Sequence, residues 1–109
     1  MVLGTSVELR VVLVTAPDVE LGGRLARTLV EERLAACVNL VPQVHSIYRW
    51  EGKLQEDAEV LLVIKTRADR VAALAQRVTA LHPYALPEII ALPVLDGNAA
   101  YLRWVSQET

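Results

Sequence analysis

Residues 36–65, ACVNLVPQVHSIYRWEGKLQEDAEVLLVIK, contain the pattern that decides the fold. From Ala36 to Trp50 the stretch is rich in Val, Ile, Tyr and Trp and has no helical period, which is typical of a β-strand. Glu51-Gly52 is a turn signal, and residues 53–65 return as a second strand that ends in the apolar run VLLVI. The stretch therefore predicts one long β-hairpin.

The segments that flank this hairpin predict further strands and helices. Val7 to Thr15 begins with apolar–charged alternation and becomes fully apolar, as an inner strand does. Asp18 is a plausible helix N-cap, and an amphipathic helix follows that ends near Leu34. After the hairpin, residues 66–69 have the spacing of a capping box, and residues 71–81 match helical spacing closely.

A short apolar strand is predicted over residues 88–95, followed by a last helix that Asp96-Gly97-Asn98 opens. Pro93 cannot donate to a ladder, so this strand should lie at a sheet edge or end there. The order of elements is βαββαβ plus one helix, in a single domain over residues 1–109. It predicts an α+β, ferredoxin-like sandwich with a long hairpin between its second and third strands and an extra C-terminal helix.

The predicted hairpin is too long for its domain. A strand from Ala36 to Trp50 spans roughly 50 Å, whereas a compact domain of this length has a diameter of roughly 35 Å. The overhanging tip carries Ile47, Tyr48 and Trp50 and needs a surface to lie on, which favours an oligomer. The alternative is that Pro42 makes a bulge and the outer half packs on its own sheet. Tyr48 and Trp50 share one face, as interface anchors or as a stacking surface for a ligand.

Composition excludes several classes of protein. Hydrophobic residues make up 53% of the 109 residues and charged residues 22%, which is typical of a globular protein with a core. The net charge of −2 and the lack of a basic patch argue against a nucleic-acid partner. No apolar run is long enough to cross a membrane, and residues 1–6 lack a secretion signal. One cysteine fits a reducing cytoplasm, which is the location we expect.

The densest group of chemically useful side chains is HPYALPE, residues 82–88. Two prolines stiffen it, so that it forms either a site or a stiff corner of the fold. His82 is a candidate metal ligand or acid–base group, but a histidine at a helix C-terminus is also favoured by the helix dipole. The chain has two histidines and one cysteine, so a tight metal site needs ligands from more than one subunit. Cys37, within an apolar run, is expected to be a small core residue.

Glu59 abuts the buried run that begins at Val60, and a carboxylate entering a core needs a cationic partner, for which Lys65 is one candidate. Signatures of catalysis are missing: the chain has no GxSxG, no Walker loop and no GxGxxG after its first strand. The sequence therefore gives no reason to expect an enzyme.

Several blocks of the sequence resemble the CutA divalent-cation tolerance family. They are VTAPD (residues 14–18), ERLAACVNLVP (32–42), SIYRWEGK (46–53), LLVIKT (61–66), HPYALPEII (82–90) and GNAAYLRW (97–104). The resemblance implies a ferredoxin-like subunit in a tight homotrimer whose hairpins wrap adjacent subunits. It also implies tolerance to copper and other divalent cations in the cytoplasm, with no known catalytic activity. The positions that match the family's intersubunit clefts are Tyr48, Trp50, Glu59, Lys65, His82, Tyr84 and Glu88.

One departure from the family pattern bears on metal binding. Members for which copper ligation has been proposed carry a cysteine before the TAPD motif and two histidines before Pro-Tyr. Val14 and Leu81 occupy two of these three places here, which leaves His82 as the candidate ligand for copper or another divalent cation. The alternative function is a trimeric small-molecule-binding or signalling scaffold, similar to the P-II regulatory proteins. In that case the cleft around Trp50, Lys65, Tyr84 and Glu88 would hold an anionic metabolite.

Overall fold

The fold is an antiparallel sheet with two helices on one face, as the order of predicted elements required. A computed structural model describes residues 7–109, and the expected lack of a secretion signal at residues 1–6 lies outside them. The sheet order is β3-β4-β2-β5, and all neighbouring strands are antiparallel. The elements in chain order are β2 (Leu9–Ala16), α1 (Val19–Glu31), β3 (Cys37–Trp50), β4 (Lys53–Arg67), the 3₁₀ turn η1 (Ala68–Arg70), α2 (Val71–Leu81), β5 (Ile90–Pro93) and α3 (Ala99–Glu108). This is the predicted ferredoxin-like α+β architecture.

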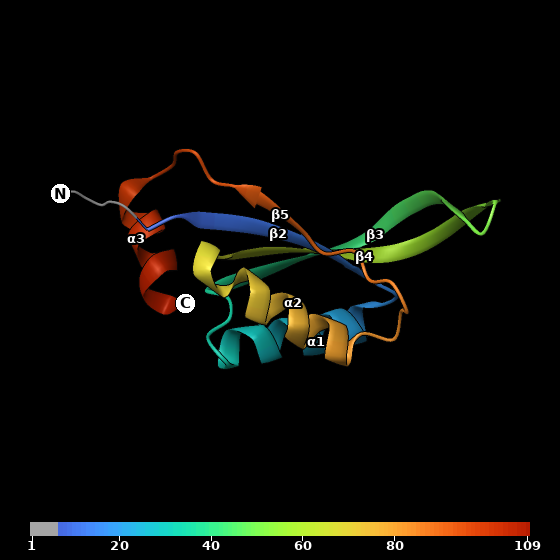
Figure 1. Cartoon of the computed structure of the whole chain (residues 1–109), viewed down its shortest axis with the longest axis horizontal. Coiled ribbons are helices and arrows are strands. Elements are labelled where there is room, and N and C mark those ends of the chain that lie inside the picture. Colours follow the sequence, from blue (N-terminus) through green and yellow to red (C-terminus); the bar gives the residue numbers. More distant parts are fainter. Residues whose placement is uncertain (1–6) are drawn as a thin grey trace.

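The hydrophobic core lies between the sheet and the helices α1 and α2, which cover the same face in Figure 1. Alternate strand residues point into it, and Val12, Val14, Leu62 and Ile64 have no exposed surface. Each such side chain stabilises the fold by about 1.5–3 kcal/mol on burial. Asp18 caps α1 as predicted, because its carboxylate accepts a hydrogen bond from the backbone N–H of Leu21 at 2.8 Å.

The opposite face of the sheet carries many apolar side chains and is only partly covered. α3 packs on one end of it, where Leu9 and Val105 are buried together. Toward the middle, the strand register places Leu13 opposite Val63 and Ile90 opposite Leu13, so that these side chains share the open face. Leu13 and Val63 are partly exposed, and Ile90 is 49% exposed. Within residues 7–109, therefore, the sheet has one buried apolar face and one that is only partly covered.

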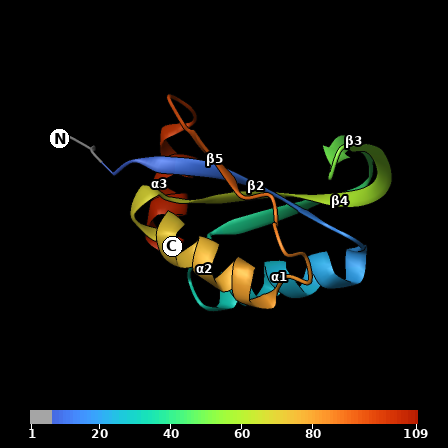
Figure 2. The same ribbon diagram turned by 45° about the vertical axis from the view of Figure 1, so that its right-hand side comes forward.

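The β3–β4 hairpin extends beyond the body of the molecule, as its length predicted (Figure 1). The chain measures 51 × 25 × 22 Å, and pairing continues to Trp50 opposite Lys53. The register shifts between Val41 and Val44, where Gln43 has a φ of 62°. The bulge expected at Pro42 is thus present, but it twists the ribbon (Figure 2) and does not fold its outer half back onto the sheet.

Two predicted boundaries were wrong at the helix termini. α1 ends at Glu31 and not near Leu34. Thr66 does not cap α2, because β4 continues to Arg67 and the buried Thr66 hydroxyl donates to the carbonyl of Leu34 at 2.7 Å. A hydroxyl inside the core needs a partner, and this one connects β4 to the segment after α1.

The C-terminal elements follow the prediction more closely. β5 is an edge strand that ends at Pro93, although it is shorter than predicted and exposed in the single chain. Asn98 caps α3 by accepting from the N–H of Tyr101 at 3.0 Å. No helix in the described part of the chain has the length and apolar character that a membrane crossing requires.

Candidate functional site

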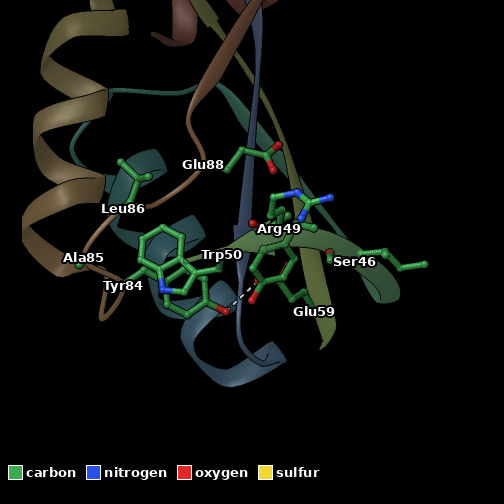
Figure 3. A pocket seen from close by; sticks show the side chains of 11 residues that line it. Ser46, Arg49, Trp50, Glu59, Tyr84, Ala85, Leu86 and Glu88 are labelled. Carbon is green, nitrogen blue, oxygen red and sulfur yellow. Dashed lines mark hydrogen bonds between the residues drawn. The ribbon is translucent and has the colours of Figure 1, made fainter. Parts of the chain in front are cut away.

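A cavity of about 610 Å³ lies where the hairpin leaves the sheet. It is bounded by the end of β2 at Thr15, by Glu59 on β4 and by two segments that are far apart in sequence. These segments are residues 46–50 of β3 and the link between α2 and β5, which contributes Tyr84, Ala85, Leu86 and Glu88. Figure 3 shows these side chains around the cavity. Its size lies within the usual range for a small-molecule site.

The hairpin register brings the polar and aromatic residues of β3 and β4 to one side of the ribbon. Val44 pairs with Glu59, Ser46 with Asp57 and Tyr48 with Gln55. Paired residues point to the same face, so Tyr48 lies on the same face of the ribbon as Asp57 and Glu59. The Tyr48 hydroxyl donates to the Asp57 carboxylate, and this bond is the main cause of the raised pKa of Tyr48.

Glu59 is the buried polar group at the centre of the site. It is 8% exposed, and its Oε2 accepts a hydrogen bond from the Tyr84 hydroxyl at 2.7 Å, drawn as a dashed line in Figure 3. Burial raises the pKa of Tyr84, and the hydrogen bond to Glu59 raises it further. Tyr84 therefore stays neutral and serves as a donor, which is what a buried carboxylate requires.

Glu88 adds a second carboxylate to the cavity wall. Partial burial raises its pKa, and the charge of Glu59 raises it further. Among the described residues, Arg49 is the one basic residue that lines the cavity. No ion pair within 4.0 Å joins it to either glutamate in the described part of the chain. The site thus carries an excess of negative charge.

His82 holds the link against the sheet. Its side chain is buried, its Nε2 lies 2.8 Å from the carbonyl oxygen of Thr15, and its Nδ1 accepts from the N–H of Tyr84 at 3.2 Å. An Nδ1 that accepts and an Nε2 that donates define a neutral ring. Its ring centroid lies 4.5 Å from that of Tyr84. A metal ion could bind this imidazole only if one of the two hydrogen bonds were released.

Lys65 is not part of this arrangement. Its ammonium group donates to the side-chain oxygen of Asn39, and it does not line the cavity. The sequence offered Lys65 as one candidate partner of Glu59, but within residues 7–109 no ion pair joins the two. Six positions along a strand correspond to roughly 20 Å, and the nearer phenol of Tyr84 meets the need for a donor.

The structure thus brings together five of the predicted cleft residues, Tyr48, Trp50, Glu59, Tyr84 and Glu88, and leaves out Lys65. Sequence reasoning missed Arg49 as a wall residue and Asp57 as the partner of Tyr48. The two-residue turn at Glu51-Gly52 fixes the register, so the sequence contained the signal that places Asp57 beside the site.

Within one chain, residues 7–109 contain no group of three or more His, Cys, Asp and Glu side chains that could hold a metal ion. Cys37 was expected in the core, but it lies partly exposed at the start of β3. His45 is exposed on the hairpin, where its Nε2 lies 3.0 Å from Oε1 of Glu56. Neither residue extends the site.

Comparison with known proteins gives consistent matches over nearly the whole chain. The family model "CutA1 divalent ion tolerance protein" matches residues 10–108. The divalent-cation tolerance protein CutA of Thermus thermophilus is 54% identical over 99 residues, which is 91% of this chain and 96% of that protein. The chloroplastic CutA 1 of Oryza sativa is 52% identical over 105 residues, which is 96% of this chain and 59% of that protein.

The structural comparison agrees with the sequence comparison. The crystal structure of CutA1 from Oryza sativa has a TM-score of 0.93 and 52% sequence identity, and the match covers 95% of each chain. The chain described here therefore belongs to the CutA1 divalent ion tolerance protein family.

Proposed function

We propose that this protein acts, without catalysis, in tolerance to divalent cations as a homotrimer that binds copper or another divalent cation weakly at clefts between subunits. The match to the tolerance family over residues 10–108 carries the proposal. The number of subunits comes from the family resemblance of the sequence blocks.

Assembly is supported by the two surfaces that the single chain leaves uncovered. The open face of the sheet exposes Val41, Ile90 and Leu92 by 42%, 49% and 44%. The hairpin tip exposes Ile47, Trp50 and Leu54 by 61%, 43% and 69%. Exposed apolar side chains gathered on one part of a protein often mark an interface, and a two-stranded ribbon gains stability by lying on a neighbour.

Metal binding in this proposal draws ligands from more than one subunit. His82 supplies an imidazole, Glu88 lies on the same link, and Glu59 lies on the adjoining strand β4. Copper(II) accepts nitrogen and oxygen ligands. Because His82 must release a hydrogen bond to Thr15 or Tyr84, the proposal predicts weak binding.

Calorimetric titration of copper(II) into the wild type, His82→Ala and His45→Ala tests this proposal. We expect His82→Ala to weaken binding and His45→Ala, which changes an exposed hairpin residue, to leave it unchanged. Electron paramagnetic resonance of the wild type with bound copper gives a readout that does not depend on the variants. A spectrum without nitrogen coupling, or equal binding by the wild type and His82→Ala, would reject His82 as a ligand.

A second candidate function, a small-molecule-binding or signalling scaffold, is favoured by one observation. The cavity of about 610 Å³ combines aromatic walls with carboxylates, which a bare metal site does not need. Thermal-shift screening against charged metabolites tests this candidate, and a screen with no stabilising compound would count against it.

The cytoplasm is the proposed location, because a chain with one cysteine fits a reducing compartment. The rice relative is named as chloroplastic. Fractionation of the source cells would decide the location of this protein.

A further inference from the structure

The charge of the cavity indicates what kind of ligand it can hold. Glu59 and Glu88 contribute two carboxylates and Arg49 one guanidinium. Asp57, beside Tyr48, adds a further negative charge near the wall. A site with this balance attracts cations and repels anions. Lys65, which belongs to the cleft of the anionic-metabolite alternative, does not line this cavity from within the same chain.

Glu59 lines the cavity and has a second carboxylate oxygen besides the one that Tyr84 binds. Its Oε2 accepts from Tyr84, whereas its Oε1 has no hydrogen-bond partner within residues 7–109. The residue is 8% exposed, and no basic side chain of the described chain lies within 4.0 Å of it. Oε1 is not among the buried unpartnered atoms of residues 7–109, so it stays accessible and can accept from a cationic hydrogen-bond donor.

The remaining walls are aromatic and aliphatic. Trp50 and Tyr84 line the cavity together with Ile47 and Leu86. Aromatic faces attract cations, and the aliphatic side chains favour a ligand with an apolar tail. In Figure 3 the dashed line joins Tyr84 to Glu59, and Trp50 and Glu88 are drawn among the lining side chains.

The geometry points to a site for a primary alkylammonium ion, an organic cation whose NH₃⁺ group donates to Glu59 Oε1 and to Glu88 while its alkyl chain packs on Trp50 and Tyr84. This inference rests on the second candidate function above and specifies its ligand class. A bare divalent ion fits less well, because the described chain groups no three ionisable ligands there. An ammonium ion needs only two acceptors and an apolar wall.

Three probes of matched shape and different charge test the site: butylammonium, butan-1-ol and butanoate. Binding is followed by NMR chemical shifts of the Trp50 indole N–H in the intact protein, with Trp50→Phe to assign the signal. We expect butylammonium to bind at least tenfold more tightly than the other two. A tenfold ratio of affinities corresponds to about 1.4 kcal/mol, which is close to the contribution of one charge-assisted hydrogen bond.

Variants then assign the binding to the two carboxylates. Glu59→Gln and Glu88→Gln are each expected to weaken butylammonium roughly tenfold or more. Glu31→Gln makes the same chemical change on the exposed face of α1 and should have no effect. Glu88 is only partly buried, so Glu88→Gln remains informative if Glu59→Gln fails to fold.

The outcomes separate this inference from the proposed trimer. A trimer that binds none of the three probes would overturn the ammonium site and leave the trimer standing, as would occur if a neighbouring subunit filled the cavity. Equal or tighter binding of butanoate would overturn the site as well. Tetramethylammonium, which has no N–H donor, serves as a further control. If it binds and butylammonium does not, the site is an aromatic cage that does not use the carboxylates as acceptors, and the inference is rejected. Binding of butylammonium by a monomer would uphold the site and reject the trimer.

Discussion

At the scale of single residues, the main question is which group donates a hydrogen bond to the buried carboxylate of Glu59. The sequence indicated that Glu59 enters the core and needs a partner. It could not indicate which one, because the phenol of Tyr84 comes from a link whose path over the sheet depends on the whole fold. The Tyr84 hydroxyl donates to Oε2 of Glu59 at 2.7 Å. The backbone N–H of Tyr84 in turn donates to Nδ1 of His82.

Tyr84→Phe should destabilise the protein by about 1–3 kcal/mol, because it leaves a buried carboxylate oxygen without its donor. Tyr48→Phe is the matched control. It removes the same atom, but its partner Asp57 is exposed and can bind water, so the loss should be about 1 kcal/mol or less. Urea denaturation of both variants measures the difference. Equal losses of unfolding free energy in the two variants would show that the Tyr84–Glu59 hydrogen bond contributes no more to stability than the Tyr48–Asp57 bond.

Glu88 should titrate above its ordinary pKa of 4.5, because of its burial and the charge of Glu59. NMR titration of the side-chain carboxyl carbon measures this pKa directly. In Glu59→Gln the pKa of Glu88 should fall toward 4.5 but remain above it, since burial is the larger cause. An unchanged value in the variant would mean that the two carboxylates do not interact.

The same shift predicts how stability depends on pH. An acid whose pKa is raised in the folded state contributes stability below its unfolded pKa and loses it as pH rises through the folded pKa. Glu88→Gln replaces the ionisable carboxyl group by a neutral amide, so the variant does not lose stability in this way as pH rises. The variant should therefore gain stability relative to the wild type at pH 7 and show less of this gain at pH 4, in thermal unfolding at the two pH values. A relative gain that is larger at pH 4 would contradict the assigned direction.

At the scale of elements, the sequence predicted the kind and order of each helix and strand but not every boundary. Periodicity revealed α2, and the cap at Asp18 marked α1, because these signals are local. Thr66 was misread because its spacing imitates a capping box, while the hydroxyl is used across the core on Leu34. Tertiary contacts of this kind leave no local pattern.

Adjacent glycines in α1 give a matched pair of variants. A Cβ at Gly23 would meet only the flexible side chain of Arg27, at 3.3 Å, so Gly23→Ala should gain about 1 kcal/mol from helix propensity. A Cβ at Gly22 would press on Leu40 and Leu62 at 3.2 and 3.4 Å. Gly22→Ala should therefore gain less or lose stability in chemical denaturation. A larger gain at Gly22 would contradict the close packing of α1 on the sheet.

At the scale of the whole molecule, two features support the proposed assembly of several subunits. One face of the sheet is apolar and only partly covered, and the hairpin extends beyond the body with aromatic residues at its tip. The sequence predicted the second feature from strand length alone. It did not reveal the first, because a strand covered on both sides and one waiting for a neighbour have the same apolar pattern.

The mass of the protein in solution tests the trimer most directly. Size-exclusion chromatography with multi-angle light scattering at micromolar concentration should give three times the chain mass of 12.0 kDa, about 36 kDa. A single species of 12.0 kDa would contradict the account, because the open sheet face and the overhanging hairpin would then be stable in water without a partner.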